Sequence, residues 1–439
     1  MTDFSAKLDK LAEAAIQVGL GLKSGQELLL FAPIDALPLA RKVTEHAYRA
    51  GASLVTPFYI DDDSVLLRYR HAPDDSFDAV PKWLYDGMGK AYRSGAARLH
   101  IMSDNPSLLA KEDPVKVGRS MAARAKAAQP MMEPIMRWDV NWSIIAAATP
   151  TWAAVVFPHE QPDAALAKLW DAIFAATRID ENDAVENWSR HAASLRSRAD
   201  HLDDKRYSAL HYRGPGTDFR LGLADDHIWK CAGNTAGNGA RFVANMPTEE
   251  IFTMPHKDRA DGWVAASMPL SHGGALIEGM RLRFEGGRVV EARADKGLPV
   301  LEKILDTDPG SRHLGEVALV PVSSPISRSG LLFYNPLFDE NASCHLALGQ
   351  SIPMNLRDGA TLSQDQQAAK GANHSVIHVD WMIGSNRIDI DGITSAGAAE
   401  PLMRAGEWDR GRDRNGTCPS LRTGRAELPH PALRLKSAR

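Results

Sequence analysis

Four short segments in the second half of the chain carry oxygen and imidazole groups of the kind that bind divalent metal ions. They are Asn245-Met246-Pro247-Thr248-Glu249-Glu250, Gly315-Glu316, Asp339-Glu340-Asn341-Ala342-Ser343-Cys344-His345 and His378-Val379-Asp380. Together these segments can hold two hydrated metal ions, and a water molecule shared between two cations is a strong nucleophile at neutral pH. They therefore predict a hydrolytic centre with two metal ions.

Each acid also has an ordinary explanation when it is taken alone. Glu250 precedes the apolar pair Ile251-Phe252 at the expected start of a strand, where a buried acid is costly unless it is paired or bound to metal. A surface turn explains this acid equally simply. Glu316 precedes an apolar run, where burial favours its protonated form, whereas a neighbouring dication keeps it ionised and lets it bridge two ions. An ordinary glutamate at a strand edge fits the same local sequence.

His378 and Asp380 are two residues apart in a stretch that favours a strand. Alternation along a strand sends residues i and i+2 to the same face, so both side chains reach one site while Ile377 and Val379 pack behind them. Such a pair alone is a weak signal. With the other three segments present, coincidence is the poorer explanation.

Glu340 and His345 need a bend between them to meet. In a helix, their spacing of five residues corresponds to a rotation of about 500°, which leaves the two side chains roughly 140° apart. They converge only if the chain bends, or else one of them acts from outside the ligand set. Cys344 is expected to be a small buried thiol rather than a zinc ligand.

The first half of the chain alternates between helical and strand-like segments, an order that predicts βαβ units over a largely parallel sheet. No glycine-rich nucleotide-binding motif occurs in it. Helices are expected at 8–18, at 39–47 and from Pro162-Asp163, and strands at 28–31, 54–59, 99–102 and 153–157.

The chain has 439 residues, 44% of them hydrophobic, and thus exceeds what one core usually supports. We expect an α/β N-terminal domain over 1–206, which ends in a charged helical stretch from Glu181 to Arg206. Short strands separated by glycine turns then predict a β-rich α+β metal-binding domain over 207–408. The segment 409–439 is basic and lacks periodicity, so it is expected to be a disordered tail, with a docking arm for an acidic partner as the alternative.

Composition restricts the partners and the compartment. A net charge of -4 argues against nucleic acid as the main partner. No run of about 20 apolar residues predicts a membrane span, and the N-terminus lacks the pattern of a secretion signal. The three cysteines form no CxxC pair and leave one over in any disulfide scheme, which suits a reducing compartment. We therefore expect a cytoplasmic location.

The same segments carry a specific resemblance. The strings NMPTEEIFTMP at 245–255, GEVALV at 315–320, LFYNPLFDENASCHLALG at 332–349 and HVDWMIGS at 378–385 resemble the aminopeptidase T family of metallopeptidases, which also includes aminopeptidase S and PepS. The motifs occur in order and near the family spacing. The resemblance extends to about residue 405, including DIDG at Asp389 and EPLMRAG at Glu400. Only the tail falls outside it.

The resemblance implies a two-domain homodimer that removes N-terminal residues from peptides with two divalent ions, zinc, cobalt, manganese or magnesium. It implies Glu316 as the bridge between the ions and Glu340 as a ligand or proton carrier. One departure concerns a tyrosine common in the family seven residues after the motif histidine, since this chain has Ile352 there. The implied ligands are Glu250, Glu316, Glu340, His345, His378 and Asp380.

These residues lead to a mechanistic hypothesis. Two cations lower the pKa of a bridging water toward 7, polarise the scissile carbonyl and bind the free α-amine of the peptide. A carboxylate, Glu340 or alternatively Glu249, takes the proton from water and passes it to the leaving amine.

Two alternatives stay open at this point. His345, His378 and Asp380 also make the ligand set of a mononuclear non-haem iron dioxygenase that cleaves aromatic rings, although a single iron has no need of the bridging carboxylate Glu316. An inactive metal-binding homologue is the other alternative, which Ile352 favours. The sequence defines neither the preferred N-terminal residue nor the physiological metal.

Overall fold

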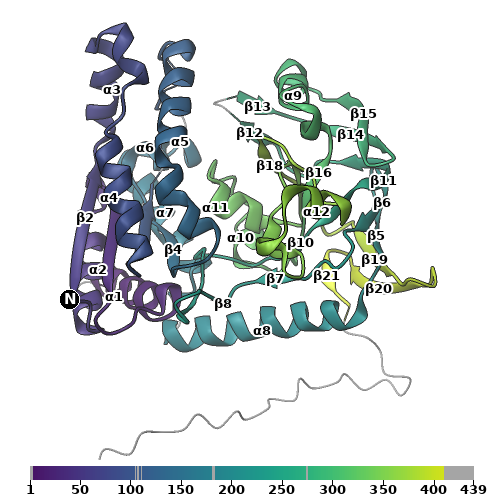
Figure 1. Cartoon of the computed structure of the whole chain (residues 1–439), viewed down its shortest axis with the longest axis horizontal. Helices are drawn as coiled ribbons and strands as arrows, with labels where there is room; N and C mark the ends of the chain where they lie inside the picture. Colours follow the sequence, from purple (N-terminus) through teal and green to yellow (C-terminus); the bar gives the residue numbers. More distant parts are fainter. Residues whose placement is uncertain are drawn as a thin grey trace, which may run out of the picture.

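The computed structural model describes residues 3–103, 105, 108–109, 111–179, 183–272 and 275–409. The predicted tail, apart from Asp409, lies outside these residues. The chain forms two parts that lie side by side, with the long helix α8 (Ala184–Lys205) along one edge of both (Figure 1). None of the helices in the described ranges is long and apolar enough to cross a membrane.

The first part is built around a four-stranded parallel sheet with strand order β2-β1-β3-β4. Helices connect consecutive strands, as parallel pairing requires, and the expected βαβ arrangement is confirmed. The strands are β1 (Glu27–Pro33), β2 (Leu54–Ile60), β3 (Ala97–Met102) and β4 (Trp142–Ala146). The helices are α1 (Asp3–Ala14), α2 (Leu37–Arg49), α3 (Asp62–His71), α4 (Lys82–Arg93), α5 (Pro114–Met136), α6 (Pro150–Val156) and α7 (Pro162–Ala176).

One predicted strand is wrong. The apolar run 153–157 lies mostly in helix α6, and the fourth strand is β4, which precedes it. A short buried apolar run does not by itself distinguish a strand from a helix. The deciding signals are Pro150 at the first helical turn and Thr149 before it, whose side chain accepts a hydrogen bond from Trp152 N (3.4 Å).

The second part consists mainly of two antiparallel sheets, which confirms its β-rich character. The larger has strand order β15-β14-β11-β6-β5-β19-β20-β21, and the smaller has strand order β18-β17-β16-β10-β7. The strands of the larger sheet are β5 (Ala209–Gly214), β6 (Thr217–Leu223), β11 (Pro255–Ala265), β14 (Arg281–Glu285), β15 (Arg288–Arg293), β19 (Asp389–Ile393), β20 (Ala399–Arg404) and β21 (Glu407–Trp408). Those of the smaller sheet are β7 (Lys230–Cys231), β10 (Ile251–Thr253), β16 (Leu314–Leu319), β17 (His345–Gly349) and β18 (His378–Met382).

Short elements complete this part. Two two-stranded sheets pair β8 (Asn234–Thr235) with β9 (Arg241–Phe242) and β12 (Leu270–His272) with β13 (Ala275–Ile277). The helices are α9 (Leu298–Leu305), α10 (Pro325–Ser329), α11 (Pro336–Asp339) and α12 (Gln364–Ala369). The expected boundary at 206–207 falls between α8 and β5. That the two parts are separate domains stays a prediction.

A backbone link carries the chain from the first sheet to the metal-binding segments. Ile144 N of β4 donates to Ala244 O (2.8 Å), and Met246 N donates to Ile144 O (2.9 Å), so the segment before Glu250 pairs with the edge of the parallel sheet. Gly19 allows this approach, since a Cβ atom there would lie 2.8 Å from Met246 Sδ. The parallel sheet of the first part therefore fixes the position of the segment that leads to Glu250.

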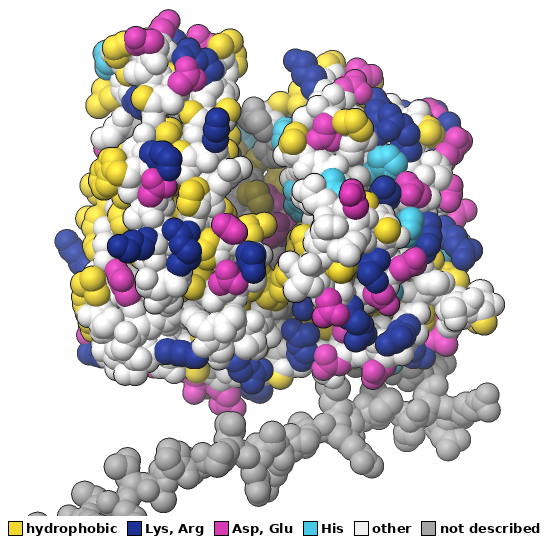
Figure 2. All heavy atoms as spheres, viewed as in Figure 1, with side chains coloured by type: hydrophobic (Ala, Val, Ile, Leu, Met, Phe, Trp, Pro, Cys, Tyr) yellow, Lys and Arg dark blue, Asp and Glu magenta, His cyan; other side chains and the backbone are white. Residues whose placement is uncertain are grey.

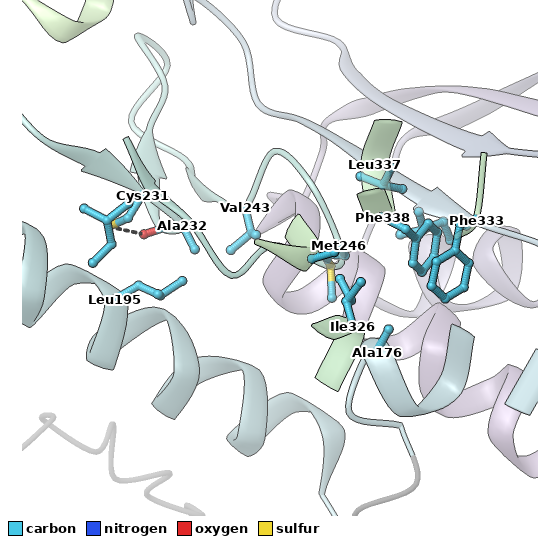
Figure 3. Packing of buried hydrophobic residues seen from close by; sticks show 14 of the residues in the cluster. Ala176, Leu195, Cys231, Ala232, Val243, Met246, Ile326, Phe333, Leu337 and Phe338 are labelled. Carbon is cyan, nitrogen blue, oxygen red and sulfur yellow. Dashed lines mark hydrogen bonds between the residues drawn. The ribbon is translucent and has the colours of Figure 1, made fainter. Parts of the chain in front are cut away.

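The apolar core continues through this link. One cluster of buried residues extends from Leu8 of α1 to Met403 of β20. Figure 3 shows a portion of it, with Met246 from the linking segment, Ile326 of α10 and Phe338 of α11 in one packed group. A shared core fixes the two parts relative to each other, and the site between them depends on that placement.

Candidate metal centre

Three of the predicted ligands meet in the interior. The ligand atoms of Glu250, Glu316 and His345 all lie within 4.8 Å of one another. His345 Nε2 is 3.3 Å from Glu250 Oε2 and 3.6 Å from Glu316 Oε1. The three residues retain only 8%, 5% and 1% of their exposure. Burial of two carboxylates this close is unfavourable unless positive charge accompanies them.

His378 and Asp380 extend the cluster on the other side of Glu316. His378 Nε2 lies 3.7 Å from Glu316 Oε2 and 3.4 Å from Asp380 Oδ1. Each oxygen of Glu316 therefore faces a different imidazole, Oε1 toward His345 and Oε2 toward His378. The His378 side chain keeps 31% of its exposure, so this end of the cluster is the open one.

The register of the smaller sheet explains the convergence. Directly opposed residues of antiparallel strands point to the same face, and Ala347 of β17 lies opposite both Glu316 of β16 and Asp380 of β18. His378 lies opposite Gly349. Small side chains at 347 and 349 leave space on this face between the larger ligands. The predicted alternation of His378 and Asp380 on a strand is confirmed.

Glu340 reaches the same place from outside the sheet. It begins a short 3-10 turn, Glu340–Ala342, after which the backbone becomes extended at Ser343 and enters β17. This is the bend that the five-residue spacing required. Cys344 is buried, and its Sγ donates to Val320 O (3.3 Å), as expected of a small buried thiol.

Backbone carbonyls fix the tautomers of both imidazoles. His345 Nδ1 is 3.2 Å from Ser343 O, and His378 Nδ1 is 2.8 Å from Gln350 O. A carbonyl only accepts hydrogen bonds, so each Nδ1 carries a hydrogen and donates it. In the neutral ring, Nε2 then carries the lone pair, and it points at the carboxylates. Metal-ligating histidines usually have this arrangement.

The charges of the cluster do not balance within the protein. Burial raises the pKa of Glu316, and burial together with the charges of Glu250 and Asp380 holds the pKa of Glu340 well above its usual range. Although burial alone would lower the pKa of His378, the contact with Asp380 raises it to about 10. In the absence of a metal ion, protons on the imidazoles therefore supply the positive charge that balances the buried carboxylates.

Other observations test whether the residues fit a metal ion. Asp380 Oδ1 is buried, and although His378 Nε2 lies 3.4 Å away, this oxygen accepts no hydrogen bond of good geometry from the described residues. Those that line the cavity beside the cluster include no lysine or arginine. Carboxylate oxygens and two imidazole nitrogens without other partners are the donor set of a divalent cation, so the residues fit the group.

The cavity beside the cluster has a volume of about 290 Å³ and two kinds of wall. Glu250, Glu316, Glu340, His378 and Asp380 form the charged wall. The apolar wall consists of hydrophobic lining residues from both parts of the molecule, including Met136, Trp138, Trp142, Phe252 and Ile352. Figure 2 shows the surface hollowed between the two parts, with hydrophobic and acidic side chains inside.

Sequence reasoning missed the contribution of the first part. Trp138 and Trp142 follow helix α5 and reach the cavity from the edge of the parallel sheet. The available signal was a pair of tryptophans four residues apart after a helix, which does not indicate what they face.

Glu249 was considered as an alternative proton carrier, and its position contradicts this. Its carboxylate pairs with Arg178 at 2.7 Å and 2.9 Å and does not line the cavity. Glu340 is the remaining candidate.

Buried acids and imidazoles that converge beside a cavity define a metal-dependent enzyme. The sequence matches the family model described as thermophilic metalloprotease (M29) over residues 4–408, and the chain belongs to this family. It is 47% identical to aminopeptidase T of Thermus thermophilus over 409 residues, which cover 93% of this chain and all of the relative. It is 42% identical to aminopeptidase AmpS of Bacillus subtilis over 408 residues, with 93% and 100% covered.

The fold agrees with these relatives. The solved structure of wild-type AmpT from Thermus thermophilus superimposes with a TM-score of 0.87 at 45% identity, covering 92% of this chain and 99% of that one. The resemblance in the motif segments is therefore confirmed as membership of the family.

Proposed function

We propose that the centre binds two divalent cations bridged by Glu316 and that it cleaves the first peptide bond of peptides with a free N-terminus. The chain is a metallo-aminopeptidase through its membership of the M29 family over 4–408. The number of cations and the role of each residue are the proposal. The observation that supports it best is that the two oxygens of Glu316 face different imidazoles, at 3.6 Å and 3.7 Å.

The ligands divide around this bridge. Glu250 and His345, in contact at 3.3 Å, would hold one cation, and His378 and Asp380, in contact at 3.4 Å, would hold the other. Zinc, cobalt, manganese and magnesium all accept such ligands. When bound, the cations supply Lewis acidity and an activated water molecule.

Glu340 moves the proton in this proposal. It lines the cavity beside Glu316, within the same group of side chains as the proposed ligands, where a carboxylate can contact a water molecule held at the centre. It accepts a proton from water and donates it to the leaving amine. Glu340 is not needed to complete either ligand pair, so it is free for this role.

The two walls of the cavity orient the substrate. The charged wall takes the α-amine and the scissile carbonyl, and the apolar wall with Trp138 and Trp142 contacts the side chain of the first residue. An amine held at the charged wall restricts cleavage to N-terminal residues. A homodimer and a cytoplasmic location, as expected from the sequence, complete the proposal.

The iron dioxygenase alternative is disfavoured by the same geometry. A set of two histidines and one carboxylate does not use Glu250 or Glu316, yet both lie within 3.6 Å of His345 Nε2. Membership of a metalloprotease family also points away from ring cleavage.

The test is chelation followed by titration with cobalt or zinc, with leucyl-p-nitroanilide as substrate and metal content measured per chain. We expect activity to disappear with the metal and to return as the second equivalent binds. A folded, metal-loaded sample that releases no nitroaniline would contradict the function. Full activity at one equivalent would contradict the bridge.

A further inference from the structure

A buried ion pair joins the first part of the chain to the metal centre from behind. Arg178, just after α7, places Nη1 2.7 Å from Glu249 Oε1 and Nη2 2.9 Å from Glu249 Oε2. The two side chains keep 14% and 4% of their exposure. Only Nη2 has hydrogen-bond geometry, toward Oε2, and Oε1 accepts no hydrogen bond from the described residues. One charge-assisted hydrogen bond and a close ion-pair contact together hold the carboxylate against the guanidinium.

The arginine is itself held in place. Its guanidinium carbon lies 5.6 Å from the ring centre of Trp188 on α8, and Trp188 Nε1 donates to Thr177 O (2.6 Å). His191, one turn further along α8, has its Nε2 2.7 Å from Thr248 O. Arg178 and His191 therefore contact the two residues that precede Glu250, Glu249 and Thr248.

Glu249 also connects to the second acid of the centre. Its backbone N–H donates to Asn341 Oδ1 (2.7 Å), and Asn341 Nδ2 donates to Leu337 O (3.1 Å). Asn341 is fully buried and follows Glu340 directly. Glu249 thus lies between the backbone of Glu250 and the turn that presents Glu340.

We propose that Arg178 and Glu249 are positioning residues that hold Glu250 and Glu340 in the metal centre. The inference rests on the proposed function, in which Glu250 is a ligand. Stability alone does not explain the pair, because replacing both members of a buried ion pair by apolar residues is often neutral or stabilising. Metal ligands must be held within about 0.5 Å, and a buried ion pair whose arginine lies against Trp188 of α8 restricts the segment that carries Glu250.

The experiment compares Glu249→Gln, Arg178→Met and the double change Arg178→Met with Glu249→Leu. Lys168→Met is the matched control. It removes an ion pair between Lys168 of α7 and Glu160, which lies just before that helix, and this pair is far more exposed than the pair under test. Cobalt affinity is measured by calorimetry, the cobalt site by its visible absorption, and each variant is followed for Tm, kcat and KM.

We expect both single changes to lower Tm and to weaken cobalt binding by about 10- to 100-fold, as loss of groups that orient ligands does. We also expect kcat to fall by a similar factor, while KM stays within about twofold of the value for the unchanged protein. The double change should restore most of the Tm, because neither charge is left buried alone. Cobalt affinity, the cobalt spectrum and kcat should stay altered.

Recovery of cobalt affinity together with Tm in the double variant would overturn the inference. So would single variants that lose stability yet bind cobalt as the unchanged protein does. The affinity measurement also separates this inference from the proposed function. If the unchanged protein binds cobalt but cleaves no peptide, the function fails while the positioning role is still tested.

Discussion

Two buried acidic sites in the second part of the molecule differ in whether the protein itself supplies a positive charge beside the acid. Asp391 of β19 keeps 4% of its exposure and accepts from Arg213 (2.5 Å) and from Arg404. Burial alone would raise the pKa of Asp391, but Arg404 and Arg213 hold it below its usual value. At the metal centre the described lining residues include no such cation. Where the protein supplies the counter-charge the acid is structural, and where it does not, the site is open to a metal ion.

Glu316→Gln is expected to have the largest effect on the metal centre. We expect kcat/KM to fall by at least about a thousandfold, or about 4 kcal/mol of transition-state stabilisation, because the bridging charge is lost. One equivalent of bound metal should disappear with it. In the metal-free protein the same change should raise Tm, since it removes a carboxylate whose pKa is raised mainly by burial and further by the charges of Asp380 and Glu250.

The measurements are steady-state kinetics, metal content and thermal unfolding with chelator. A variant that keeps its activity and both metal equivalents would show that Glu316 does not bridge. A variant that keeps one iron and oxidises an aromatic ring would favour the dioxygenase.

Asp391→Asn should act in the opposite sense, on stability alone. It leaves Arg213 and Arg404 without their acid, and breaking a buried pair costs about 3 to 5 kcal/mol. Because 46% and 36% of the two arginine side chains are exposed, solvent screening reduces the expected loss to about 2 kcal/mol. Urea unfolding measures it, and cobalt affinity should not change. Altered affinity without a loss of stability would contradict the comparison.

The two sites should also respond oppositely to pH in the absence of metal. The pKa of His378 is raised to about 10, so its contribution to stability is complete below its unfolded pKa of about 6.5 and is lost as the pH rises toward 10. The lowered pKa of Asp391 contributes stability above its unfolded value of about 3.9 that is lost as the pH falls.

Urea unfolding between pH 6 and 10, with chelator and with cobalt, tests the contribution of His378, and unfolding between pH 2 and 5 tests that of Asp391. The loss at high pH should diminish when cobalt is bound, since the metal-bound imidazole is already deprotonated. His378→Gln is the control and should weaken the loss in the metal-free protein. An identical pH profile with and without cobalt would contradict the assignment of His378 as a ligand.

The sequence allowed candidate ligands to be predicted from four segments taken together, and for some of them local geometry gave the reason. The alternation of His378 and Asp380 follows from strand geometry, and the need for a bend before His345 follows from helix geometry. The parallel sheet of the first part likewise followed from its helix and strand order.

The residues that sequence reasoning missed act through tertiary contacts. Arg178 is more than 70 positions from Glu249, and their pairing depends on how α7 and α8 pack against the link to the second part. Trp138 and Trp142 face the cavity only because that link pairs with β4. No local periodicity carries this information, whereas the error over 153–157 came from a local pattern that fits two structures equally well.

The apolar wall gives the mildest test, at Ile352. This side chain lines the cavity with Glu316, Glu340 and His378, so a group at this position faces the space in which the substrate is proposed to bind. We expect Ile352→Tyr to raise kcat by about tenfold, because a phenol there donates a hydrogen bond to the developing oxyanion, and one such donor is worth at least about 1.4 kcal/mol. Kinetics with leucyl-p-nitroanilide measure the change.

Ile352→Phe supplies the matched control, since it adds nearly the same ring without the hydroxyl. It should leave kcat close to that of the unchanged protein and change only KM, because the larger ring fills part of the cavity. Equal gains in both variants would mean that packing against the first residue of the peptide limits turnover, and the apolar wall would then take part in catalysis as directly as the charged one.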